Sequence, residues 1–131
     1  MLKKLHHIGI LLEDFDGKVK RFEKFGLACS KVIEKKEEAL QIAFFPIGDT
    51  LIEFISYTTN KSDDLSQLIR SQQGQLNHLC FEVDDIEATI QDFEKNGAKL
   101  IEGSLRVGVT GRIAFFHPET TDGILIELTE P

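Results

Sequence analysis

Two histidines and two glutamates occupy matching positions in the two halves of the chain. His7 begins an apolar segment in the first half, and His78 begins the corresponding segment in the second. Glu53 and Glu127 each interrupt an apolar run near the end of their half. Imidazole nitrogens and carboxylate oxygens bind divalent metal ions, and a charge in an apolar strand is costly unless it is paired or bound. The pattern therefore predicts a metal site built from both halves.

These matches belong to an internal duplication. Residues 7–45 align without a gap on residues 78–116, and both copies carry Phe-Glu-Lys and Ile-Ala-Phe-Phe at equivalent places. Extra residues in the second copy then bring Leu-Ile-Glu at 51–53 onto Leu-Ile-Glu at 125–127. Duplicated units usually pack about a pseudo-two-fold axis, which brings equivalent residues together. We therefore expect the two histidines and two glutamates to converge on one ion.

The four side chains would give that ion two nitrogen and two oxygen ligands. This mixed set suits an octahedral divalent ion with two further positions open to water or substrate. An ion with open positions can act as a Lewis acid toward a carbonyl or enediolate oxygen. The ligand set does not choose among Zn, Ni, Co, Mn, Fe and Mg, so the expected cofactor is one divalent metal ion of undetermined identity.

The elements that must position these residues follow from the hydrophobic periodicity. Each half reads as a strand, an amphipathic helix closed by glycine, and three further strands, which predicts an α+β fold of two βαβββ modules. In the first half the expected strands are 5–12, 27–34, 39–46 and 50–56, with a helix at 16–25. In the second half they are 77–83, 98–102, 110–116 and 123–129, with a helix that begins after Asp84-Asp85.

Length and charge bound the organisation and the partners. The 131 residues suit a single domain, with module one at 5–57, a linker helix within 58–76 and module two at 77–130. A net charge of −7 argues against nucleic acid or an anionic membrane as the main partner. Apolar runs are far shorter than the roughly 20 residues that span a bilayer. We therefore expect a cytoplasmic protein that binds a small molecule.

Other polar residues have more than one interpretation. Arg106 and Arg112 lie in a glycine-containing loop of the second half, where they can hold a phosphate or carboxylate of the substrate or be solvated loop charges. His6 corresponds to Asn77 in the repeat, so it is expected to have a structural role.

The two modules and their four ligands resemble the vicinal oxygen chelate superfamily, which includes glyoxalase I, methylmalonyl-CoA epimerase, extradiol dioxygenases and antibiotic-resistance proteins. The similarity spans residues 5–129 and is strongest to the epimerases at 7–10, 77–86, 111–118 and 123–128. The resemblance implies a cupped, incomplete barrel around the metal. It also implies a homodimer, for which we expect the first strand and the helix at 16–25 near the contact.

The resemblance also implies an activity. A member of this kind would stabilise an enolate or enediolate and move a proton on a small thioester or hemithioacetal, with Glu127 as the first choice and Glu53 as the second choice for the proton-transferring residue. Lactoylglutathione lyase (glyoxalase I) activity is the alternative. A second alternative is a metal-free protein that binds a small molecule or antibiotic in the same cup.

One position departs from the epimerase pattern. Matching the strand before Pro46 to that of the epimerases puts Gln41 where they carry a catalytic glutamate, and an amide cannot take a proton from carbon at neutral pH. Gln41 is therefore expected to lie at the substrate in a protein with one base, unless Glu37 or Glu38 takes over. On this alignment, Gln41→Glu should raise epimerase turnover.

Overall fold

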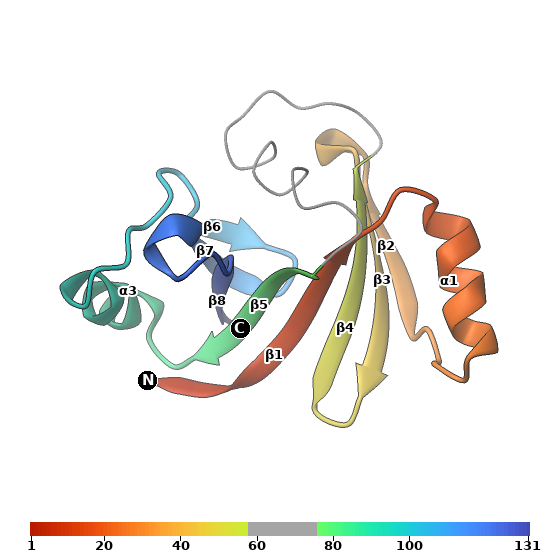
Figure 1. Cartoon of the computed structure of the whole chain (residues 1–131), viewed down its shortest axis with the longest axis horizontal. Helices are drawn as coiled ribbons and strands as arrows, with labels where there is room; N and C mark the ends of the chain where they lie inside the picture. Colours follow the sequence, from red (N-terminus) through yellow and green to blue (C-terminus); the bar gives the residue numbers. More distant parts are fainter. Residues whose placement is uncertain (58–75) are drawn as a thin grey trace. The chain divides into compact units, whose positions relative to one another are not determined.

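The computed structural model describes residues 1–57 and 76–131, which belong to two compact units (Figure 1). The His7 unit is residues 7–77, and the His78 unit is residues 1–6 together with 78–131. The helix predicted in the linker lies outside the described residues. Within the described residues, no helix is long and apolar enough to cross a membrane.

The elements of the first module follow the expected order. They are β1 (Leu2–Leu11), α1 (Phe15–Lys24), β2 (Lys31–Lys35), a 3-10 turn (Lys36–Glu38), β3 (Leu40–Ile47) and β4 (Thr50–Tyr57). The strand order is β1-β4-β3-β2, in which β1 and β4 run parallel and the other neighbours run antiparallel. The hairpin between β3 and β4 turns at Gly48-Asp49, within the segment predicted for it.

The second module repeats this arrangement. Its elements are β5 (Leu76–Val83), α3 (Ile86–Lys95), β6 (Arg106–Gly108), β7 (Gly111–Phe116), a 3-10 turn (Pro118–Thr120) and β8 (Ile126–Glu130). The strand order is β5-β8-β7-β6, again with the first pair parallel. The Asp85 side chain caps α3 by accepting a hydrogen bond from the Ala88 N–H at 3.0 Å, as the acidic pair before this helix suggests.

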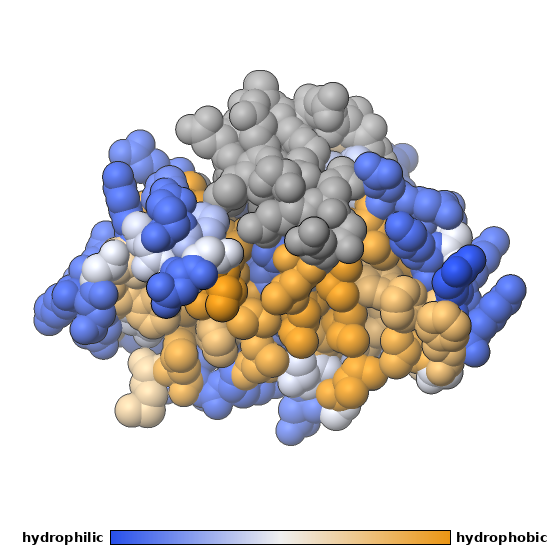
Figure 2. Space-filling view, viewed as in Figure 1, coloured by the Kyte–Doolittle hydropathy of each residue, from blue (hydrophilic) through white to orange (hydrophobic). Residues whose placement is uncertain are grey.

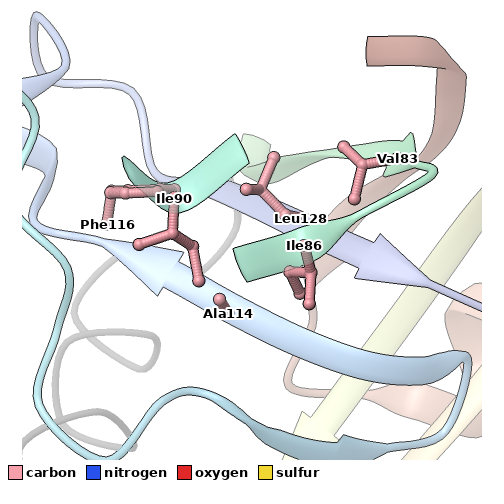
Figure 3. Close-up of a cluster of buried hydrophobic side chains, with 6 residues drawn as sticks. All are labelled: Val83, Ile86, Ile90, Ala114, Phe116 and Leu128. Carbon is pink, nitrogen blue, oxygen red and sulfur yellow. The ribbon is translucent and has the colours of Figure 1, made fainter. Parts of the chain in front are cut away.

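Each helix covers one face of its own sheet. Figure 3 shows the apolar side chains of α3, β5, β7 and β8 packed together, and the six residues that are fully buried there are Val83, Ile86, Ile90, Ala114, Phe116 and Leu128. In the His7 unit, α1 packs Phe15, Val19 and Phe22 against Ala43, Phe45 and Phe54. Hydrophilic side chains gather over the outer side of both helices in Figure 2.

Strand alternation then assigns the ligand candidates to the opposite face. Successive side chains of a strand point to opposite sides of the sheet. Phe54 and Leu128 pack under the helices, so Glu53 and Glu127, one position before them, point away from the helices. We call the surface under the helix the helix face of each sheet, and the surface that carries histidine and glutamate the site face.

The strand predicted at 98–102 is wrong. Only Leu100 forms an isolated bridge there, with Phe116, and the outer strand of the sheet is β6 instead. The Ser104 hydroxyl explains the difference, because it accepts from the Phe115 N–H at 3.0 Å and lies 2.7 Å from the Ile101 carbonyl oxygen. A side chain thus occupies the place of a ladder hydrogen bond, and Gly103 turns the chain with a φ of 76°.

Gly111, in the hairpin between β6 and β7, allows a stability prediction, with Gly48, in the hairpin between β3 and β4, as its control. A Cβ at Gly111 would lie 2.4 Å from the Glu130 carbonyl oxygen, and its φ is +126°. Gly48 also has a positive φ, +60°, but nothing lies within 4 Å of the Cβ it would gain. Strained backbone costs about 1–3 kcal/mol. We expect Gly111→Ala to lower the free energy of unfolding by more than the cost of backbone strain alone, because the added Cβ also clashes with Glu130. Gly48→Ala should lower it by less than Gly111→Ala does, because its Cβ meets no atom. Urea denaturation measures both changes.

Candidate metal centre

The His7 unit brings its histidine and glutamate into contact. Two residues beyond His7 on β1, Gly9 lies directly opposite Glu53 on the parallel strand β4. His7 Nδ1 is 3.1 Å from Glu53 Oε2. Their exposed fractions are only 2% and 3%. A carboxylate withdrawn from water to this extent is costly unless a hydrogen-bond donor or a cation compensates it, and His7 is placed to supply part of that compensation.

The His78 unit repeats this pair in the same register. Two residues beyond His78 on β5, Cys80 lies directly opposite Glu127 on β8. His78 Nε2 is 3.0 Å from Glu127 Oε1, and both residues are buried, with exposed fractions of 3% and 5%. The edge of the His78 ring meets Phe115, with ring centroids 5.7 Å apart. The duplication therefore extends from the sequence to the geometry of the site.

The donor chemistry of each pair fits a divalent ion. Each unit offers one imidazole nitrogen and one carboxylate oxygen, close together and shielded from water. Two such pairs would supply the mixed nitrogen and oxygen set that first-row divalent ions accept, with positions left for a substrate. That both pairs bind the same ion stays a prediction.

Arg112 lies on the helix face of its sheet. It is opposite Glu130 in the register of β7 and β8, three positions from Glu127. Its guanidinium contacts the Glu87 carboxylate at 2.5 Å and that of Glu130 at 3.5 Å, and these carboxylates raise its pKa, the Glu87 hydrogen bond most. Glu130 also accepts a hydrogen bond from the Ile86 N–H at 2.9 Å. Arg112 thus ties β7 to α3 and β8, which speaks against the predicted contact with substrate.

Gln41 also lies on the helix face. It is opposite Ser56, whereas Phe44, three positions later on β3, is opposite Glu53, so the Gln41 and Phe44 side chains point to opposite faces. Its amide nitrogen donates to Glu34 Oε2 at 3.4 Å. The Gln41 side chain therefore points away from Glu53, and its expected place at the substrate stays a prediction.

Arg106 is the third residue predicted to bind substrate, and it lies on the site face. It is opposite Ile113 on β7, and Ile113 is opposite Thr129, two residues after Glu127. Arg106 is exposed. Of the three predicted substrate contacts, only this one shares a face with a ligand candidate.

Comparisons with known proteins agree with this architecture. The family described as the glyoxalase/bleomycin resistance protein/dioxygenase superfamily matches residues 6–116. The chain belongs to this superfamily. The mitochondrial methylmalonyl-CoA epimerase of Homo sapiens is 27% identical, over 98% of this chain and 74% of the relative. The uncharacterized protein YqjC of Bacillus subtilis is 31% identical, over 99% and 94%.

A solved structure of the same superfamily shows the same fold. A variant of Streptomyces coelicolor methylmalonyl-CoA epimerase, in complex with 2-nitronate-propionyl-CoA, superposes with a TM-score of 0.84 at 24% identity. The superposition covers 99% of this chain and 95% of the other. The predicted α+β fold of two βαβββ modules is thereby confirmed, and the chain is a distant homologue of the epimerases.

Proposed function

We propose that this superfamily member is a divalent-metal enzyme that stabilises the enolate or enediolate of a small thioester or hemithioacetal and moves one proton. The proposed ligands are His7, His78 and Glu127, with Glu53 as the fourth. The observation that carries the proposal is the repetition of one buried histidine–glutamate contact in both units. A single buried pair has structural explanations, but two pairs in the same register of duplicated sheets favour a shared role.

The proposed ion would supply one kind of chemistry. A divalent ion bound by these side chains acts as a Lewis acid toward substrate oxygens, which lowers the cost of negative charge on an enolate.

Glu127 is the proposed proton carrier. Its carboxylate takes the proton from the carbon next to the substrate carbonyl, and the electron pair of the broken C–H bond becomes the enolate. The same carboxyl group then returns the proton to carbon. Its low exposure, 5%, slows the exchange of that proton with water, and the contact with His78 Nε2 holds the carboxylate in place. Glu53 is the second choice, because it has the same environment in the other unit.

The site face of β3 favours a mechanism with one proton carrier. The residues that share this face with Glu53 are Leu40, Ile42, Phe44 and Pro46, all of them apolar. No carboxylate within β3 therefore stands beside Glu53, so a second base would have to come from another element, such as the turn before β3 that carries Glu37. Epimerisation through two opposed bases needs such a group, whereas a reaction in which one carboxylate removes and returns the proton does not. This favours lactoylglutathione lyase-type chemistry as the alternative within the same class.

The relatives support a thioester as the substrate class. The curated relatives that the chain matches over 98% of its length include epimerases of methylmalonyl-CoA, and the superposed structure binds an acyl-CoA analogue. We therefore place methylmalonyl-CoA and the hemithioacetals of methylglyoxal first among the substrates to assay.

Metal analysis of a matched pair of variants tests the proposal. We expect the purified protein to retain stoichiometric divalent metal and His78→Ala to lose it, because the replacement removes a proposed ligand. His117→Ala is the control, since His117 contacts the exposed Glu119 at 3.5 Å and should be irrelevant to the metal. The readouts are metal content and turnover of methylmalonyl-CoA and of methylglyoxal hemithioacetals.

The other results would decide among the alternatives. Turnover of a hemithioacetal without turnover of methylmalonyl-CoA would favour lactoylglutathione lyase activity. A protein that binds no divalent metal and turns over neither substrate would contradict the proposal, and a non-catalytic binding protein would then be the better explanation.

A further inference from the structure

Cys80 places a thiol on the site face of the His78 unit. It follows His78 by two positions on β5 and is directly opposite Glu127 on β8, so all three side chains point to the same side of the sheet. Its exposed fraction is 0%. A buried cysteine with only apolar neighbours acts as a small apolar side chain, whereas a thiolate beside a second donor binds soft metal ions. The surroundings of Cys80 therefore decide its role.

A histidine of the same unit lies beside this thiol. The beginning of β1, up to His6, belongs to the His78 unit. The Lys3 ammonium fixes this segment to the unit, because it lies 3.5 Å from the Glu82 carboxylate and 3.4 Å from that of Asp84. One ring nitrogen of His6 lies within 4.8 Å of Cys80 Sγ. Two metal-binding side chains from distant parts of the sequence thus meet within one compact unit.

The separation of these two donor atoms suits a shared ion. Bonds of about 2.3 Å to sulfur and about 2.0–2.1 Å to nitrogen, the values for zinc, allow the two donors to be at most roughly 4.4 Å apart. The His6 nitrogen and the Cys80 sulfur therefore need to approach each other by no more than about 0.4 Å. Small rotations within the side-chain rotamer wells can supply a movement of this size.

The types of the two donors favour a soft ion of single charge. Thiolate sulfur selects soft ions such as Cu(I), whereas carboxylate oxygen suits Mg and Mn. Two donors also complete a linear coordination, which Cu(I) accepts and which leaves a divalent ion short of ligands. A thiolate, a neutral imidazole and Cu(I) together carry no net charge, so the complex is less costly to bury than an unpaired ion.

The duplication contains this pair only once. His6 corresponds to Asn77 and Cys80 corresponds to Gly9, so the equivalent place in the His7 unit has neither an imidazole nor a thiol. The His7 unit nevertheless keeps the buried histidine–glutamate contact. Neither the fold of a module nor that contact requires the His6–Cys80 pair, which favours a separate role for it.

We propose that His6 and Cys80 form a second metal site, which binds one Cu(I) ion or a soft ion of the same class through a ring nitrogen and the thiolate sulfur. The thiol releases its proton to solvent when the bond between sulfur and metal forms, and no oxidation state changes. Both ligands lie within one unit, so the inference does not depend on the proposed function or on the convergence of the two histidine–glutamate pairs.

Competition with the coloured chelator bicinchoninate measures Cu(I) binding, in an anaerobic buffer that contains ascorbate. We expect the wild-type protein to take up one equivalent. Cys80→Ala should weaken binding by more than the roughly 10–100-fold that loss of a residue outside the ligand set costs. His6→Asn should do the same, because either variant leaves a single donor. The melting temperature shows that each variant is folded, and Cys80→Ser replaces Cys80→Ala if the latter is not.

Cys29→Ala is the matched control for the thiol. Cys29 is the other cysteine of the chain, and it is partly exposed, with its thiol donating to the Lys31 carbonyl oxygen at 3.4 Å. Cys29→Ala should bind Cu(I) as tightly as the wild type does. Equal losses in the two cysteine variants would overturn the inference, because any thiol would then explain the uptake.

His78→Ala separates this site from the proposed divalent centre. It should lose divalent metal and keep Cu(I), because His78 is not a ligand of the second site. Loss of both metals would overturn the inference, since the soft ion would then occupy the centre already proposed. A wild-type protein that takes no Cu(I) from bicinchoninate would also overturn it. A protein that binds Cu(I) through Cys80 but holds no divalent metal would contradict the proposed function alone.

Discussion

Glu127→Gln should reduce kcat roughly 10²–10⁴-fold, which is the usual contribution of a general base. The substitution keeps the size of the side chain and an oxygen that can contact His78, 3.0 Å away in the structure. It removes the group that can accept a proton from carbon. The loss should therefore appear in turnover, measured on whichever thioester or hemithioacetal the protein accepts, while the melting temperature changes little.

Glu53→Gln is the matched comparison, because the duplication places Glu53 in the same register and at nearly the same burial. If Glu127 carries the proton and Glu53 acts as a ligand, Glu53→Gln should weaken metal binding with a smaller loss of kcat at saturating metal. Solvent deuterium incorporation into the substrate gives a second readout, since Glu127→Gln should also slow exchange of the acidic hydrogen. Equal kcat for the wild type and Glu127→Gln would contradict the assignment, and a reversed order of the two variants would move the role to Glu53.

The duplication predicts that the two histidines and two glutamates lie close together, but not which histidine contacts which glutamate. A strand segment that begins with histidine and another that contains Leu-Ile-Glu occur in both copies, and parallel pairing of these segments brings the side chains together in each unit. Burial of the glutamates was also predictable, because each lies within an apolar strand. The apolar pattern and the repetition agree on these four residues, while their convergence on one ion stays a prediction.

The faces of the remaining polar residues depend on register, which the sequence does not show directly. A shift of one residue in a strand moves a side chain to the other face. Gln41 and Arg112 are equivalent in the duplication, and both lie on the helix face. The same one-residue uncertainty in strand register therefore explains why both were expected at the substrate.

The same reasoning identifies a position on β3 where a second base could be introduced. Ile42 follows Gln41 and lies on the site face, opposite Ile55, which is two residues from Glu53. Diagonal neighbours of this kind are about 7–8 Å apart between Cα atoms, so a carboxylate at position 42 could reach a substrate held at Glu53. A carboxylate at position 41 would instead meet Glu34, the present partner of the Gln41 amide.

We therefore expect Ile42→Glu to raise epimerisation of methylmalonyl-CoA, by a measurable part of the roughly 10²–10⁴-fold that a general base contributes, provided that the protein accepts this thioester. Gln41→Glu should give no gain. Ile42→Gln is the control for shape, because glutamine has the same size as glutamate and cannot act as a base.

Ile42 is 5% exposed, and losing its burial costs about 1.5–3 kcal/mol, so both position-42 variants should melt at a lower temperature than the wild type. Epimerase rates are compared at a temperature where both are folded. A gain with Gln41→Glu and none with Ile42→Glu would mean that β3 presents the opposite face to the substrate, and the one-carrier mechanism would lose its structural basis.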